Sequence, residues 1–276
     1  MRVKMENIKN SICLFDVDGT LTESRKLVQR TVIDSLRELS FVTEIGFLTG
    51  SDLEFAKEQL WPIFADPELN VNCHVLPCNG TKYYIPNPDT PGHFITIHEN
   101  NMYSKLGHEK FQIIMKIIME FQAEIAMSQH DVPFTGHHIQ NRDSMINWSP
   151  IGRNTNDGDR KQFMSIDKLF GLRKDYHHRF LKILHEHGIL DVLVKIAGDT
   201  SFDIFPDGWD KTYALKHFPE TDWDVFFVGD RCSPSGNDWE LYNHLQPLGR
   251  SFETSGPEET VEIIDIHLHR LVGELG

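Results

Sequence analysis

The sequence contains few cysteines and an excess of acidic over basic residues, and it has no long hydrophobic run. The spacing of its four cysteines does not match a metal site, which favours reduced thiols and a cytoplasmic location. No apolar stretch is long enough to span a bilayer and no signal peptide is evident, so we expect no membrane association. Lys and Arg number 27 against 41 Asp and Glu, a formal net charge of −14. This balance argues against a nucleic-acid partner, but a few arginines could still bind a small anionic substrate.

The most informative segment is Leu14–Thr22, which reads L-F-D-V-D-G-T-L-T. If Ile12–Phe15 is a buried strand, Asp16 and Asp18 follow its carboxyl end, where open α/β sheets place their ligands. Asp16 could then attack a phosphorus atom as a nucleophile while Asp18 handles the proton of the leaving group. A polar turn is the alternative interpretation, although turn statistics alone do not explain so specific a pattern. The segment resembles the first motif of the haloacid dehalogenase superfamily, whose members pass phosphoryl groups through an aspartyl phosphate.

The two outer thirds of the chain alternate strands and helices in the manner of βαβ units. Apolar strands are predicted at Ile12–Phe15, Glu44–Leu48 and Val225–Val228. Helices are predicted over Val28–Leu39, from an N-cap at Asp52 towards Leu60, and from about Pro257. Strands that are apolar along nearly their whole length indicate a parallel sheet covered on both faces.

The middle of the chain indicates a separate α+β module. One helix is predicted over Phe111–Ile125 and a second over Tyr176–Leu184. Short strands are predicted at Phe94–Ile97, Met145–Trp148, Leu193–Ile196 and Ser201–Ile204, and turn-rich hinges at Pro86–Gly92 and Pro206–Gly208. The predicted fold is therefore a Rossmann-like α/β core of residues 1–87 and 208–276. Residues 88–207 would form an inserted cap with an antiparallel sheet and two helices.

Three further segments could complete a phosphotransfer site. The hydroxyls and amides of Thr49-Gly50-Ser51 suit phosphate oxygens, although a helix N-cap alone would explain the same residues. Lys211 could offset the negative charge of the transfer, although an isolated loop lysine is usually just solvated. Asp230 ends an apolar strand and Asp238 lies in the loop that follows. If Asp230 meets Asp16, the two supply the oxygen ligands that Mg²⁺ prefers.

Longer segments resemble the eukaryotic-type phosphomannomutases, a haloacid dehalogenase family with an inserted cap. The resemblance covers nearly the whole chain and is carried by Arg25, Asn147–Arg153, Gly198–Lys211 and Gly229–Asp238. The run S-F-D-I-F-P-D-G-W-D-K that ends at Lys211 is much more specific than the first motif alone.

The resemblance implies interconversion of mannose 6-phosphate and mannose 1-phosphate, and thus a place in GDP-mannose biosynthesis. It implies Mg²⁺ as cofactor, a hexose 1,6-bisphosphate activator and a homodimer formed through the cap. Asp16 would be the phosphorylated nucleophile, Asp18 the general acid/base and Lys211 a further catalytic residue. Mg²⁺ would be held by Asp16, the backbone carbonyl of Asp18 and Asp230, with Asp238 as a further candidate. Phosphate would bind at Thr49, Ser51 and Lys211. The hexose phosphate would also contact Arg25, Arg142, Arg153, Arg160, Ser201 and Asp203.

Arginines in the cap also have a physical rationale, because a mutase must hold the phosphate that is not reacting. Arginine binds such a dianion through two parallel hydrogen bonds and is permanently charged. The run Asn141–Ser144 departs from the family's usual Phe-Arg-Asn-Gly, so Arg142 is a weaker match than Arg153. Arg160 lies in the polar run Asn154–Arg160, where a solvated surface arginine is a competing interpretation.

Two alternatives to a mutase remain open. A sugar-phosphate phosphatase on the same scaffold would pass the phosphoryl group from Asp16 to water, and an inactive protein would only bind sugar phosphates. Cap arginines favour the mutase, because they let a bisphosphate bind by either end. The joint presence of Asp16, Asp18, Lys211 and Asp230 disfavours an inactive protein. His244 stands where relatives tend to carry an acid, which argues against a second cation there.

Overall fold

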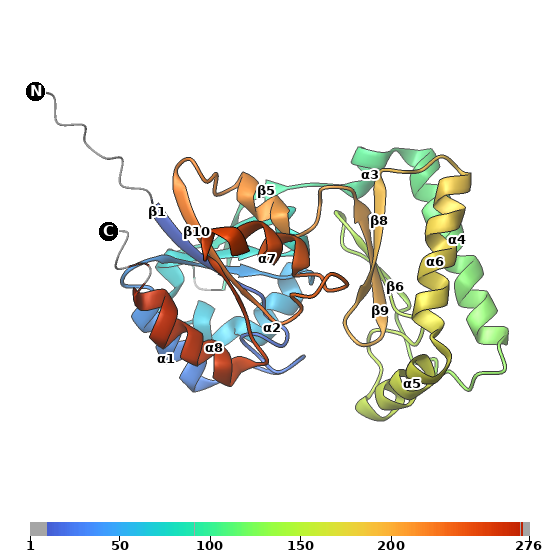
Figure 1. Cartoon of the computed structure of the whole chain (residues 1–276), viewed down its shortest axis with the longest axis horizontal. Coiled ribbons are helices and arrows are strands. Elements are labelled where there is room, and N and C mark those ends of the chain that lie inside the picture. Colours follow the sequence, from blue (N-terminus) through green and yellow to red (C-terminus); the bar gives the residue numbers. More distant parts are fainter. Residues whose placement is uncertain (1–9, 91, 271, 273–276) are drawn as a thin grey trace, which may run out of the picture. The chain divides into compact units, whose positions relative to one another are not determined.

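The chain folds into two compact units in the computed structural model, which describes residues 10–90, 92–270 and 272 (Figure 1). Unit 1 comprises the described residues up to Glu99, Asp210–Pro234 and those from Asp238 onward. Unit 2 comprises Asn100–Trp209 and Ser235–Asn237. The two main crossings, after Glu99 and after Trp209, lie later in the chain than the boundaries predicted at residues 87 and 207.

Unit 1 is built on a seven-stranded sheet with the order β11-β10-β1-β2-β3-β4-β5. The strands from β11 to β3 run parallel to their neighbours, and β4 and β5 are antiparallel additions at one edge. Their bounds are β1 Asn10–Phe15, β2 Glu44–Leu48, β3 Cys73–Leu76, β4 Lys82–Pro86, β5 Phe94–Glu99, β10 Trp223–Gly229 and β11 Ser251–Glu253.

Helices cover both faces of this sheet because its central strands are apolar on both sides. The helices are α1 Arg30–Leu39, α2 Leu53–Phe64, α7 Trp239–Leu245 and α8 Pro257–Ile263. On β1, Cys13 and Phe15 join the cluster formed by α1, α2 and α8, and Figure 1 shows α1 and α8 side by side. The alternate residues Ile12 and Leu14 pack with α7 and the 3₁₀ helix η3 (Lys211–Lys216). The parallel sheet with covered faces is as predicted.

Unit 2 contains a four-stranded antiparallel sheet with the order β6-β7-β9-β8. Its strands are β6 Ile139–Asn141, β7 Ile146–Trp148, β8 Val192–Ala197 and β9 Ser201–Pro206, and its helices are α3 Met102–Leu106, α4 His108–Met127, α5 Asp157–Phe170 and α6 Leu172–Glu186. One face of the sheet packs on α4 and α6: Trp148 stacks on Phe202 with ring centroids 4.7 Å apart, and both Phe121 of α4 and Tyr176 of α6 contact Trp148.

The assignment of the strand Phe94–Ile97 to the cap was wrong. This segment is β5, which pairs with β4 in the sheet of unit 1. The predicted hinge Pro86–Gly92, of which Pro91 lies outside the described residues, therefore connects two strands of one sheet rather than the two units.

The middle of the chain also has more helices than predicted, because α3 and α5 accompany the expected α4 and α6. α5, all of whose residues are described, buries only the side chain of Phe163, although Phe163, Ile166 and Phe170 recur at helical spacing along it. Across the ranges that the structure describes, no helix combines the length and the apolar character needed to cross a membrane.

Candidate active site

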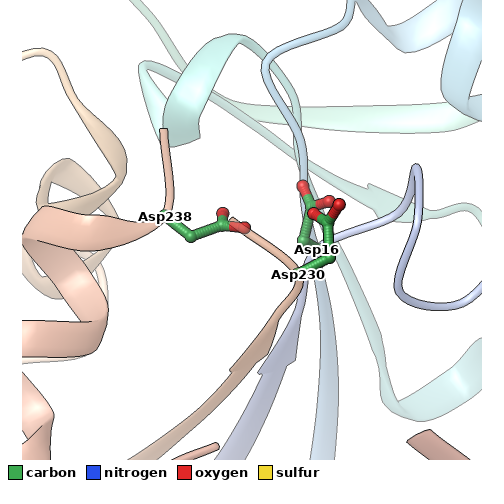
Figure 2. Close-up of side chains that lie close together, drawn as sticks. All are labelled: Asp16, Asp230 and Asp238. Atoms are coloured by element: carbon green, nitrogen blue, oxygen red, sulfur yellow. The ribbon is translucent and has the colours of Figure 1, made fainter. Parts of the chain in front are cut away.

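Asp16 and Asp230 follow the carboxyl ends of two adjacent strands. β1 and β10 are parallel, Phe15 pairs with Val228, and the Asp16 N–H donates a hydrogen bond to the Val228 carbonyl at 2.9 Å. Asp230 comes directly after Gly229, the last residue of β10. Figure 2 shows the two carboxylates close together beyond the strand ends. The register of two apolar strands thus joins acids from opposite ends of the sequence.

The loop after Asp230 turns back and adds a third carboxylate, that of Asp238. The loop is closed by the Arg231 N–H, which donates to Asp238 Oδ2 at 3.0 Å. The Asp238 side chain is fully buried and points towards the other two acids (Figure 2). One carboxylate oxygen from each of Asp16, Asp230 and Asp238 lies within 4.8 Å of the others. The three acids therefore offer a compact set of oxygen ligands.

Two glycines make room for this arrangement. Gly19 has a φ of +86°, and a Cβ at this position would lie 2.5 Å from Asp230 Oδ2. A Cβ on Gly229 would lie 2.7 Å from Asp238 Oδ2. The glycine of the first motif is thus required both by its backbone conformation and by the approach of a carboxylate.

Lys211 provides a positive charge within the cluster. It begins η3, where Asp210 caps the helix by accepting a hydrogen bond from the Thr212 N–H at 2.8 Å. The Lys211 ammonium contacts the Asp16 carboxylate and lies 2.5 Å from Asp238 Oδ1, with no part of the side chain exposed. Burial acts to lower the pKa of Lys211, but the carboxylates of Asp16 and Asp238 outweigh it and raise that pKa. The two carboxylates therefore favour the charged form of the ammonium.

The three acids still outnumber the single lysine. Burial raises the pKa of Asp16 well above its usual range; Lys211 opposes this increase, while Asp238 and Asp230 add to it. Burial and then repulsion by Asp238 raise the pKa of Asp230 to about 6, with Arg231 and Lys211 opposing. A divalent cation would favour the ionised carboxylates, and oxygen ligands are those that Mg²⁺ prefers. The residues present therefore fit a magnesium ion.

The carboxylate of Asp18 is held apart from this cluster. Its Oδ1 accepts one hydrogen bond from the Arg25 backbone N–H and another from Gln59 Nε2, each at 2.9 Å. Arg25 has a φ of +63°, a left-handed conformation that is uncommon for arginine. A ligand role for the Asp18 backbone carbonyl, and a substrate role for Arg25, stay predictions.

Gln59 was not predicted as a site residue, although the sequence contains a signal for it. On α2 it lies on the same buried face as Ala56 and Ile63, three residues before and four residues after it. A polar side chain in the apolar stripe of a helix must find a hydrogen-bond partner inside the protein. That partner is Asp18.

Thr49 and Ser51 lie in the loop between β2 and α2, at the carboxyl end of the strand next to β1. The Ser51 N–H donates to Thr49 Oγ1 at 3.1 Å, and Asp52 caps α2 as predicted. The loop is fixed by the N–H groups of Cys78 and Asn79, which donate to the carbonyls of Ser51 and Thr49, both at 2.9 Å. The amides and hydroxyls at this helix N-terminus suit phosphate oxygens.

In unit 2, Asp203 lies in the middle of a polar row on the sheet face opposite Trp148. Across the strands it pairs with Asn147 of β7 and Lys195 of β8. Asn147 Nδ2 donates to Asp203 Oδ1 at 2.7 Å, and the buried Arg142 places Nη1 3.9 Å from the same oxygen. Ser201 precedes Asp203 by two residues and so lies on the same face. The alternation of polar and apolar residues in β9 is the sequence signal for this row. Lys195, which pairs with Asp203 in the row, was not predicted as a site residue.

Arg160 and Arg153 lie on other elements of unit 2. Arg160 is in the first turn of α5, and its Nη2 donates to Asp199 Oδ2 at 3.0 Å, so it is not a freely solvated arginine. The Arg153 N–H donates to the His137 carbonyl at 3.0 Å. Arg153 follows Gly152, where φ is +90° and a Cβ would lie 2.8 Å from the backbone nitrogen of Gly136.

Known proteins match both the sequence and the fold. Phosphomannomutase 2 of Dictyostelium discoideum is 33% identical over 264 residues, which cover 95% of this chain and 98% of that protein. The phosphomannomutase of Saccharomyces cerevisiae is 32% identical over 255 residues, 92% of each chain. IMP-bound, N-terminally truncated IMP-nucleotidase of Plasmodium falciparum aligns with a TM-score of 0.64 at 14% identity, covering 95% of this chain and 68% of that one. Trehalose-6-phosphate phosphatase of Aspergillus fumigatus aligns with a TM-score of 0.51 at 15% identity, covering 95% and 93%.

The two solved structures share the fold, and they confirm the predicted class of a parallel α/β core with an antiparallel α+β cap. The family model for eukaryotic phosphomannomutase matches residues 32–269, a span that runs through both units. With relatives about one-third identical along almost their full length, the chain belongs to the eukaryotic phosphomannomutase family.

Proposed function

We propose that the protein is a phosphomannomutase that interconverts mannose 6-phosphate and mannose 1-phosphate through a phosphoryl group carried on Asp16. The observation that carries this proposal is the buried contact of Lys211 with Asp16 and Asp238, beside Asp230 at the strand ends. In a member of this family, such a cluster of acids around one buried cation supports a role in phosphoryl transfer.

The proposed cycle starts with phosphorylated Asp16. The phosphoryl group passes to the C1 hydroxyl oxygen of mannose 6-phosphate, and the Asp18 carboxylate takes up the hydroxyl proton. The resulting bisphosphate then binds in the opposite orientation, and an Asp16 oxygen attacks its 6-phosphate. The bond between phosphorus and the sugar oxygen breaks, and Asp18 returns the proton to that oxygen. A hexose 1,6-bisphosphate would activate the enzyme by phosphorylating Asp16 in the same way.

The charged and polar groups around Asp16 would favour this phosphoryl transfer. Lys211 offsets the negative charge that builds up between Asp16 and the phosphate, and Thr49 and Ser51 would donate hydrogen bonds to the phosphate oxygens. Mg²⁺ held by Asp16, Asp230 and Asp238, with the Asp18 backbone carbonyl, would screen the repulsion between nucleophile and substrate.

Unit 2 would hold the rest of the substrate. Arginine side chains at positions 142, 153 and 160 would bind the phosphate that is not reacting, and Ser201 and Asp203 would contact the hexose phosphate. Arg25 is a further candidate contact to the hexose phosphate. We also propose a cytoplasmic homodimer formed through unit 2, whose product supplies GDP-mannose biosynthesis.

One assay tests the function. Purified protein is incubated with Mg²⁺, mannose 1-phosphate and a trace of glucose 1,6-bisphosphate, and both mannose 6-phosphate and inorganic phosphate are measured. Formation of mannose 6-phosphate is the expected result. Release of inorganic phosphate without mannose 6-phosphate would show that the protein is a phosphatase and not a mutase. The absence of both products would indicate a protein that only binds sugar phosphates. Asp16→Asn should abolish turnover, whereas Asp89→Asn, an exposed acid in the β4–β5 turn, serves as the matched control.

A further inference from the structure

We infer that Gln59 is a positioning residue for proton transfer: it holds Oδ1 of Asp18, so that Oδ2 of the same carboxyl group exchanges the proton with the sugar. This inference rests on the proposed function, in which Asp18 is the general acid/base. It adds to that function a residue that holds the acid/base group in one orientation.

The amide group of Gln59 has one orientation that satisfies its neighbours. Its Nε2 lies 2.9 Å from Asp18 Oδ1 and 3.2 Å from Thr22 Oγ1, and the side chain is 3% exposed. The Thr22 hydroxyl donates its own hydrogen to the Val17 carbonyl, so it can only accept from Gln59. A flipped amide would place its carbonyl oxygen against a carboxylate. The buried Nε2 therefore faces two acceptors, and both lie in the first motif.

Asp18 receives two donors on one oxygen. The Arg25 backbone N–H and Gln59 Nε2 both point to Oδ1 at 2.9 Å. A proton on Oδ1 would collide with these two N–H groups, whereas Oδ2 can carry it. The hydrogen bonds thus decide which oxygen of Asp18 is the acid/base atom, and the left-handed backbone of Arg25 contributes to the same result.

This role can be separated from a purely structural one by the choice of leaving group. Phosphoryl transfer to Asp16 from a sugar phosphate requires a proton on the departing oxygen. Transfer from p-nitrophenyl phosphate does not, because p-nitrophenolate is stable as an anion. A residue that only supports the fold should affect the two transfers equally, whereas a residue that positions the acid should affect the first alone.

The experiment measures single-turnover phosphorylation of Asp16 from glucose 1,6-bisphosphate and from p-nitrophenyl phosphate, with the full chain in Mg²⁺. Gln59→Leu should slow transfer from the sugar bisphosphate about 10²-fold and leave transfer from p-nitrophenyl phosphate within about threefold. Equal slowing of both transfers, or no slowing, would overturn the inference. If wild-type protein accepts neither donor, the proposed function itself fails, which is a distinguishable result.

Gln122→Leu is the matched control. Gln122 also uses both ends of its partly buried amide, because its Oε1 accepts from Trp148 Nε1 at 2.8 Å and its Nε2 donates to the Pro150 carbonyl at 2.9 Å. Its loss should lower stability without changing the ratio of the two transfer rates. If Gln59→Leu does not fold, Gln59→Asn, whose shorter side chain withdraws the amide from Asp18, takes its place.

A double-mutant cycle adds a second readout. In an Asp18→Asn background no general acid is left to position, so Gln59→Leu should cause no further slowing of transfer from glucose 1,6-bisphosphate. A further loss of the same size as in the wild-type background would assign Gln59 to the fold alone.

Discussion

Lys211 and Asp238 form an ion pair that is closed to solvent: Nζ lies 2.5 Å from Oδ1, and neither side chain is exposed. The same ammonium contacts Asp16, so one cation serves two buried acids. Removing one partner of a buried ion pair leaves an uncompensated charge, which costs more than the loss of an exposed pair.

Lys211→Met should therefore affect both stability and activity. We expect the free energy of unfolding to fall by about 3–5 kcal/mol, because Asp16 and Asp238 lose their counter-charge. We expect the rate of Asp16 phosphorylation to fall about 10²- to 10³-fold. Urea unfolding and single-turnover kinetics measure the two effects. Lys216→Met, which removes a lysine on the same 3₁₀ helix whose ammonium lies over the Tyr213 ring, is the control. Normal stability in the Lys211 variant would contradict the buried pair.

Gly19→Ala should displace Asp230. A Cβ would lie 2.5 Å from Asp230 Oδ2 in a backbone at φ +86°, so the carboxylate must move away from its two partners. We expect weaker Mg²⁺ binding and a loss of activity of at least about tenfold, measured by calorimetry and by the mutase assay. Gly171→Ala introduces similar strain, at φ +66°, with no atom within 4 Å of the new Cβ. Equal effects of the two variants would show that strain alone is responsible.

Mg²⁺ should stabilise the folded protein, because it binds a ligand set that folding assembles. At a concentration 100 times its dissociation constant, a ligand that binds only the native state adds about 2.7 kcal/mol. Thermal unfolding with and without Mg²⁺ should show a higher Tm with the metal. This increase should disappear in Asp230→Asn and persist in Asp89→Asn. If Mg²⁺ raises the Tm of Asp230→Asn as much as that of the wild-type protein, the ion does not bind at Asp230.

His217 should make stability depend on pH. Burial lowers the pKa of His217 below the ordinary histidine value of 6.5, an effect that the hydrogen bond from Nε2 to the Gly80 carbonyl opposes. Because the unfolded state binds the proton more readily, the stabilisation is present above pH 6.5 and is lost as the pH falls through that value towards the lower pKa of the folded state.

The measurement is urea unfolding between pH 5 and 8. His217→Gln can still donate to the Gly80 carbonyl but does not titrate in this range, so it should lose less stability on acidification than the wild-type protein. Identical pH dependence in both proteins would rule out His217 as the titrating group. Comparison with the wild type removes the contribution of Asp230, whose raised pKa has the opposite effect on stability.

Local patterns were sufficient to predict most of the fold. The apolar runs at Ile12–Phe15 and Val225–Val228 predict strands that the structure confirms as adjacent and parallel. Sequence alone misplaced Phe94–Ile97, because a short strand signal does not say which sheet it joins. That choice depends on which strand the segment pairs with, here β4 across a turn. The helix α5 was not predicted, although the helical spacing of Phe163, Ile166 and Phe170 was a signal available in the sequence.

The site residues that follow the ends of strands could be predicted from the sequence, whereas those positioned by loops and helix packing could be predicted less well. Asp16 and Asp230 meet because parallel strands place their carboxyl ends at one edge of the sheet. The position of the Asp238 carboxylate depends on how its loop closes through the Arg231 N–H. The contact between Gln59 and Asp18 depends on how α2 packs against the first motif. Neither relationship follows from spacing along the chain. A polar residue within an apolar helix stripe, as at Gln59, is the most direct sequence clue to such contacts.

The insertion of unit 2 into unit 1 has a consequence for biosynthesis. One edge of β1 pairs with β2, which follows within a few dozen residues, but its other edge pairs with β10. A ribosome makes β10 only after the whole of residues 100–209 has been synthesised. The nascent chain therefore carries an apolar strand with one open edge while unit 2 is being synthesised. The carboxylates of Asp16, Asp230 and Asp238 can come together only when this interval ends.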